Sequence, residues 1–218
     1  GKSISHGVAA LEYDLAKEIN GQAVATEIAR HELYGCTGAE MVQEMKPYHI
    51  DFPNVKNNCL RFEVSPSIEE SATFTDADWA ELGNDFMQRM GLANHQYIII
   101  RHSGTESKKE QAHLHILANR VSLSGELYRD NWIGKKATEA ANAIAKERNF
   151  VQSQDIGKVN KAEIKEAMDG VLKKMQGFDF TKFKEELGKR GFKVREARAS
   201  TGKLNGYYVT ARSGTEYK

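Results

Sequence analysis

Apolar residues recur at intervals of three and four positions in several parts of the chain, a spacing typical of amphipathic helices. In residues 5–18, Ser5 can cap such a helix, and the apolar stripe comprises Val8, Leu11, Leu15 and Ile19. The clearest helix follows Thr75, a second capping residue, and ends at Gly91. Further helices are predicted over residues 40–46, 137–150, 161–175 and 181–189.

Other segments either alternate between apolar and polar residues or are rich in β-branched and aromatic residues, and both patterns predict strands. Strands are expected over residues 60–64, 97–101, 112–118, 192–197 and 204–211. The last two flank a turn at residues 200–203 and therefore predict a hairpin. The order of elements up to residue 150 favours an α+β fold with helices packed on an antiparallel sheet.

The polar segment 152–160 has no periodicity and is the best boundary between two domains. We expect a core over residues 1–151 and a smaller C-terminal α+β segment over residues 152–218, which further domains could follow. Charge divides in the same place: residues 1–150 carry 16 Lys and Arg against 21 Asp and Glu, whereas residues 151–218 carry 15 against 9. A basic segment can contact phosphates, although a merely solvated helical surface explains the charge equally well.

The 218 residues, 40% hydrophobic and 28% charged, are ordinary for a globular protein and long enough to bury a core. No apolar run approaches membrane-spanning length, so we expect no membrane insertion. The two cysteines, Cys36 and Cys59, are too few for a disulfide framework. With no signal-peptide pattern at the start, these features favour the cytoplasm.

Three histidines carry the most informative chemistry. His113 and His115 alternate on one predicted strand and so share a face, and a hairpin would bring His102 beside them. Three neutral imidazoles could bind one metal ion and leave positions open for water or substrate, as in catalytic sites. On spacing alone, a metal site and ordinary surface or core histidines are equally good interpretations. Imidazole donors suit Zn, Mn, Fe, Cu and Ni, whereas Mg prefers oxygen ligands.

Several motifs around these histidines resemble the relaxase family, the HUH-type mobilisation nucleases of plasmids and mobilisable transposons. They are the opening phrase Gly1–Gly7 leading into Leu11–Tyr13, the pair Arg101–His102, and the run His113–Val121. The tail Phe180–Tyr217 resembles the basic region that follows the nuclease core in such proteins.

The resemblance implies an antiparallel sheet of about five strands flanked by helices, with the helix of Tyr13 over the histidine face. It implies His102, His113 and His115 as ligands of a divalent metal ion, Mg or Mn in the family, and Tyr13 as the nucleophile. Tyr34 is the second candidate among the eight tyrosines. Family members often have an acid two places after the first histidine, but Gly104 stands there in this chain. Glu106 and Glu110 are therefore weak candidates for the acid or base.

His6, Arg120 and Lys203 are candidates for DNA contacts, although a capping or surface role is the better interpretation of His6. Side-chain alternation gives Arg101 a structural role. The implied function is site- and strand-specific nicking of transfer-origin DNA through a 5′-phosphotyrosine intermediate. The implied partners are single-stranded or supercoiled transfer-origin DNA, accessory mobilisation proteins and coupling proteins. In such a bacterial system the protein would be transferred with the DNA as a covalent adduct.

Three other functions fit the same residues. The first is a metal-dependent phosphoesterase that activates water at the histidine site. The second is a replication initiator that nicks origins by the same chemistry as a relaxase. The third is a non-enzymatic DNA-binding accessory protein with structural histidines.

Overall fold

The computed structural model describes residues 1–104, 111–212 and 214–218. The chain forms two compact units, Gly1–Phe150 and Val151–Lys218. Each unit has a hydrophobic core of its own and is described separately below.

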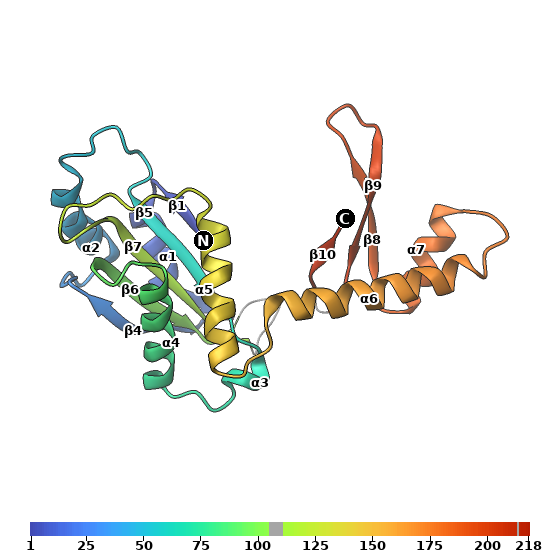
Figure 1. Ribbon diagram of the computed structural model, residues 1–218, viewed down its shortest axis with the longest axis horizontal. Coiled ribbons are helices and arrows are strands. Elements are labelled where there is room, and N and C mark those ends of the chain that lie inside the picture. Colours follow the sequence, from blue (N-terminus) through green and yellow to red (C-terminus); the bar gives the residue numbers. More distant parts are fainter. Residues whose placement is uncertain (105–110, 213) are drawn as a thin grey trace. The chain divides into compact units, whose positions relative to one another are not determined.

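The first unit is built on an antiparallel five-stranded sheet in the order β1-β5-β7-β6-β4. The strands in that order are Lys2–Ile4, Cys59–Val64, His113–Ser122, His95–His102 and Ala25–His31. The hairpin of β6 and β7 therefore lies inside the sheet, with β5 and β4 on its two sides (Figure 1). This architecture confirms the predicted α+β fold with about five antiparallel strands.

Helices cover both faces of this sheet. On one face, α4 (Asp76–Arg89) and α5 (Ile133–Glu147) pack against the side chains of Ile99, Leu114 and Ile116. On the other face, α1 (Gly7–Leu15) and α2 (Gly38–Met45) pack against Ile98, Ile100 and Leu117. Two short elements complete the helices of the first unit: α3 (Ile68–Ser71) and the 3₁₀ helix η1 (Lys46–His49).

The predicted first helix is wrong in its bounds and in its buried stripe. The helix α1 begins at Gly7 with His6 as its N-cap, so Ser5 is not the cap, and it ends at Leu15. The chain then forms a small ribbon of β2 (Glu18–Ile19) and β3 (Gln22–Ala23), joined through Asn20 and Gly21, both with positive φ. The buried residues of α1 are Gly7, Ala10, Leu11 and Asp14, whereas Val8 is 39% exposed.

Two strands of the sheet were not predicted from the pattern. Both β1 and β4 are edge strands, and their residues are mostly exposed or half-buried. An edge strand with polar side chains does not produce the apolar pattern on which sequence prediction depends.

The second unit contains two helices and a three-stranded antiparallel sheet. They are α6 (Ser153–Leu172), α7 (Phe180–Lys189), β8 (Lys193–Arg198), β9 (Leu204–Thr210) and β10 (Glu216–Tyr217). The helix predicted over residues 161–175 is wrong in its start, because α6 begins at Ser153 and continues without a break through the polar segment 152–160. Phe183, Leu187, Phe192 and Val209 are the centre of the core between the helices and the sheet.

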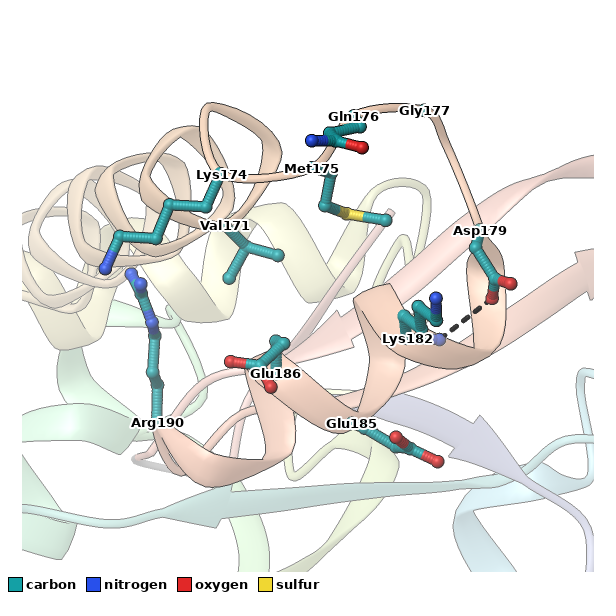
Figure 2. Close-up of a pocket in the computed structure, with 10 residues that line it drawn as sticks. All are labelled: Val171, Lys174, Met175, Gln176, Gly177, Asp179, Lys182, Glu185, Glu186 and Arg190. Atoms are coloured by element: carbon teal, nitrogen blue, oxygen red, sulfur yellow. Dashed lines mark hydrogen bonds between the residues drawn. The ribbon is translucent and has the colours of Figure 1, made fainter.

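A cavity of about 540 Å³ lies between the C-terminal end of α6 and α7 (Figure 2). Its lining has three basic and three acidic side chains: Lys174, Lys182, Arg190, Asp179, Glu185 and Glu186.

Among the helices of the described residues, none combines the length and apolar character needed to cross a membrane.

Candidate metal centre and tyrosine helix

The central hairpin brings the three predicted histidines together. His102 and His113 are direct partners in the register of β6 and β7, and His115 is two residues further along β7. One nitrogen from each imidazole lies within 4.8 Å of one from each of the other two. The ring centroids are 4.4 Å apart for His102 and His115 and 4.8 Å apart for His113 and His115. Leu114 and Ile116 point into the opposite layer, as predicted.

The local chemistry of these rings suits a bound cation. The Nε2 atoms of His113 and His115 are 3.0 Å apart, close to the spacing of about 3.3 Å between two imidazole ligands of one tetrahedral ion. The Nδ1 atom of His113 lies 3.2 Å from the carbonyl oxygen of Gln111, to which it can donate, which leaves Nε2 as a lone-pair donor.

Burial favours the neutral form of two of these rings, His102 and His115. Desolvation lowers the pKa of His102, and it lowers the pKa of His115 to about 3 with help from the neighbouring His102 and His113. A neutral imidazole is the form that binds a metal. The three donors could therefore hold a metal ion.

The C-terminal part of α1 packs directly on this centre. The Nε2 atom of His102 is 2.7 Å from the backbone carbonyl oxygen of Asp14 and can donate to it. The Asp14 carboxylate accepts two hydrogen bonds from Arg61, at 3.1 and 2.5 Å, and lies 3.9 Å from Nδ1 of His115. Burial raises the pKa of Asp14, and the hydrogen bond and charge of Arg61 act in the opposite direction.

Asp14 was missed in the sequence analysis, although a signal was present. It follows Leu11 by three residues and so belongs to the buried side of the helix, where an acidic residue needs a partner. Arg61 supplies that partner from the neighbouring strand β5.

Tyr13 lies next to Asp14 on α1 and is 56% exposed. Its hydroxyl oxygen accepts a hydrogen bond of 2.7 Å from Nζ of Lys17, and this ammonium also lies 4.9 Å from the ring centroid. The phenol is thus accessible to a large substrate at the same end of α1 that contacts His102.

Two close contacts fix the position of α1. A Cβ atom at Gly7 would lie 2.6 Å from Sγ of Cys59, so only glycine allows the start of the helix to approach β5 this closely. Further along, Oε1 of Glu12 accepts a hydrogen bond of 3.0 Å from the backbone amide of Ala39 in the first turn of α2.

The other predicted residues lie elsewhere in the first unit, in the second unit, or outside the described residues. Arg120 lies toward the opposite end of β7 and donates to the Tyr128 and Asn57 carbonyl oxygens and to the Asp130 carboxylate, which favours a structural role. His6 is exposed at the start of α1. Lys203 is exposed in the second unit. Glu106 and Glu110 lie outside the described residues.

Two further assignments can be compared with the contacts. Arg101 forms an ion pair with Asp76 at the start of α4, on the sheet face opposite His102, in agreement with a structural role. Tyr34 is 76% exposed, and its hydroxyl donates to Glu32 at 3.1 Å. The hydrogen bond to Glu32 and the charge of that carboxylate raise the pKa of Tyr34, which disfavours it as a nucleophile.

Comparison with protein families gives a match over residues 13–150, well over half of the chain, to the model described as "Relaxase: MobA/VirD2-like, nuclease domain". The chain belongs to this relaxase family. The matched residues begin at Tyr13 and include His102, His113 and His115. Searches of curated proteins and of solved structures found no match. Membership gives the protein a relaxase nuclease domain, and hence a DNA-nicking function in general terms.

Proposed function

We propose that this relaxase nicks one strand of transfer-origin DNA by transesterification, with Tyr13 as the nucleophile. The observation that supports this most is the packing of the tyrosine helix on the histidines, through the 2.7 Å contact between His102 and the carbonyl oxygen of Asp14. The phenol on the residue next to that contact is accessible, while the imidazoles of His102 and His113 are buried.

In the proposed reaction the Tyr13 oxygen forms a bond to the scissile phosphorus as the bond from phosphorus to the 3′ oxygen breaks. The phenolic proton is lost, and the departing 3′ oxygen takes up a proton to become a hydroxyl. The 5′ end of the DNA remains attached to Tyr13. Because one phosphodiester replaces another, the reverse reaction can reseal the strand.

The surrounding residues prepare this step. Lys17 holds the phenol by its hydrogen bond and places a positive charge where negative charge develops on the oxygen. Asp14 and Arg61 hold His115 and the end of α1 in place. A divalent cation, Mg or Mn, held by His102, His113 and His115 would act as a Lewis acid toward the scissile phosphate.

We further propose single-stranded or supercoiled transfer-origin DNA as the substrate, with accessory mobilisation and coupling proteins as partners. The protein would act in the bacterial cytoplasm and be transferred as a covalent adduct with the DNA. The basic residues His6 and Lys203 remain proposed DNA contacts. Glu106 and Glu110 remain candidates for the acid or base.

Covalent attachment tests the proposal. The protein is incubated with Mg or Mn and a 5′-truncated transfer-origin oligonucleotide labelled at its 3′ end, then run on a denaturing gel. Wild type and the control Tyr34→Phe should give a shifted protein–DNA band, and Tyr13→Phe should give none while binding the oligonucleotide normally. Cleavage without any attached DNA would instead indicate a phosphoesterase that uses water, and an undiminished band in Tyr13→Phe would exclude Tyr13.

A further inference from the structure

The sheet of the second unit has one face that its helices leave uncovered. Val194 and Val209 are paired in the register and point into the core with α6 and α7. The neighbouring pairs, Lys193 with Thr210 and Arg195 with Tyr208, therefore point to the opposite face. Lys193 and Arg195 are exposed on it.

Positive charge is concentrated in these strands. Residues 193–218 contain six Lys and Arg against two Asp and Glu, whereas residues 151–192 contain nine against seven. The cavity beside α7 has balanced charge in its lining, so it does not account for the basic character of the unit.

Part of this charge has no acidic partner. The two acidic residues pair with arginines, Glu216 with Arg195 and Glu196 with Arg198. Among the described residues of the unit, Lys193, Lys203 and Lys218 form no ion pair with a carboxylate.

An aromatic residue lies at the centre of the face. The Arg195 guanidinium carbon lies 3.9 Å from the ring centroid of Tyr208, and Nζ of Lys218 lies 5.9 Å from it. Because cations lie against this ring, the tyrosine is less suited to stacking an unpaired base than to contacting a phosphate with its hydroxyl.

The shape of the hairpin fits a duplex. The third strand, β10, has only two residues, so toward its tip the sheet is a two-stranded ribbon of β8 and β9. Figure 1 shows this ribbon extending away from α6, and Lys203 lies in the turn that closes it. A two-stranded ribbon fits the major groove of B-form DNA, which is about 12 Å wide.

We propose that this face, consisting of Lys193, Arg195, Lys203, Tyr208 and Lys218, is a second DNA-binding surface that docks on double-stranded DNA. It belongs to the second unit, whereas the proposed nicking site belongs to the first. This inference rests on the proposed function, in which the surface would hold the duplex that flanks the strand to be cut. The three lysines contact phosphates, Arg195 supports the face through Tyr208 and Glu216, and the ribbon enters the major groove.

The test uses the full chain with the substitution Tyr13→Phe and a chelator, so that no DNA is cleaved. Binding of a blunt, fluorescently labelled 20-base-pair DNA duplex is followed by anisotropy over a range of salt concentrations. A triple variant should weaken duplex binding about 10-fold or more; it combines Lys193→Gln, Lys203→Gln and Lys218→Gln. The slope of log affinity against log salt concentration should fall by an amount that corresponds to about two to three phosphate contacts. A matched control replaces three exposed helical lysines of the same unit: Lys165→Gln, Lys173→Gln and Lys182→Gln.

The proposal is overturned if both triple variants weaken duplex binding equally, or if the strand variant binds the duplex as wild type does. A loss confined to single-stranded DNA, or stronger competition by an RNA duplex, would also overturn it. With Tyr13 restored, the strand variant should still form the covalent adduct with a short single-stranded oligonucleotide. If no variant formed an adduct, that result would count against the proposed function. The test of duplex binding would still be valid, because it does not depend on adduct formation.

Discussion

Among single residues, the three histidines lead to a prediction about metal binding. His113→Ala combined with His115→Ala removes two of three nitrogen donors, so we expect the bound divalent cation and strand cleavage to be lost together. Metal content after dialysis, measured by mass spectrometry, checks this result. His6→Ala is the control, because His6 is exposed at the start of α1, and it should retain the metal. Equal metal content in all three proteins would contradict the assignment.

Asp14 leads to a separate prediction, because its carboxylate lies 3.9 Å from Nδ1 of His115 but is not one of the three proposed ligands. Asp14→Asn should weaken cation affinity about 10- to 100-fold, the usual effect of removing such a partner. Calorimetric titration with Mn checks the affinity. Asp76→Asn, which removes the ion pair on the opposite face of the sheet, is the control and should bind the cation normally.

The two cysteines should differ sharply in reactivity. Cys36 is exposed, whereas Cys59 is completely buried, and burial raises the pKa of its thiol to about 11. Since the thiolate is the reactive form, brief treatment of the folded protein with iodoacetamide should modify Cys36 alone. Peptide mass spectrometry locates the label, and modification of Cys59 at a comparable rate would show that α1 does not cover it as described.

At the scale of elements, Gly7 controls how closely α1 approaches the sheet. Gly7→Ala introduces a Cβ 2.6 Å from Sγ of Cys59, so it should destabilise the protein by about 1–3 kcal/mol and reduce adduct formation as the tyrosine helix shifts. Chemical denaturation and the gel assay measure the two effects. Combining Gly7→Ala with Cys59→Ala removes the clashing sulfur and should recover much of both losses, an outcome that a general defect in helix formation would not give.

How much of the fold the sequence reveals depends on where each element lies. The central strands β5, β6 and β7 and the helix α4 carry strong apolar patterns and were predicted, and the alternation of His113 and His115 placed both rings on one face. The edge strands β1 and β4 carry no such pattern. The start of α6 was missed because its exposed polar residues show no periodicity although they are helical.

The sequence reveals less of the site than of the strands. The convergence of His102 with the other two rings follows from the hairpin register, which strand pattern predicts. The pair of Asp14 with Arg61 joins residues 47 positions apart, so it depends on tertiary packing that local spacing does not encode. For the same reason, the sequence suggests a phosphate contact for Arg120, whereas in the structure its guanidinium is bonded to three internal partners.

At the scale of the whole molecule, buried neutral histidines should make stability depend on pH. Burial lowers the pKa values of His95, His102 and His115 in the folded protein. Below about pH 6.5 the unfolded chain binds protons that the folded chain does not, so stability should fall as the pH falls from 6.5 toward 5. The raised pKa of Asp14 acts in the opposite direction at lower pH and offsets part of this loss.

Thermal denaturation in chelator at pH 7.5, 6.5 and 5.5 checks this dependence. The control replaces His95, which lies outside the metal centre, by Gln in order to remove one of the titrating groups. The melting temperature of that variant should fall less between pH 6.5 and pH 5.5 than the melting temperature of wild type. A melting temperature that is constant or rises on acidification would contradict the buried neutral state of these rings.

If a phenol beside a three-histidine centre attacks DNA, the DNA becomes bonded to that phenol, so the decisive measurement locates the covalent bond. After reaction with a transfer-origin oligonucleotide, the protein is digested with nuclease and protease, and the residue that carries the remaining nucleotide is identified by mass spectrometry. We expect a nucleotide joined through its 5′ phosphate to Tyr13. A nucleotide on any other residue, or cleaved DNA with no modified peptide, would contradict it.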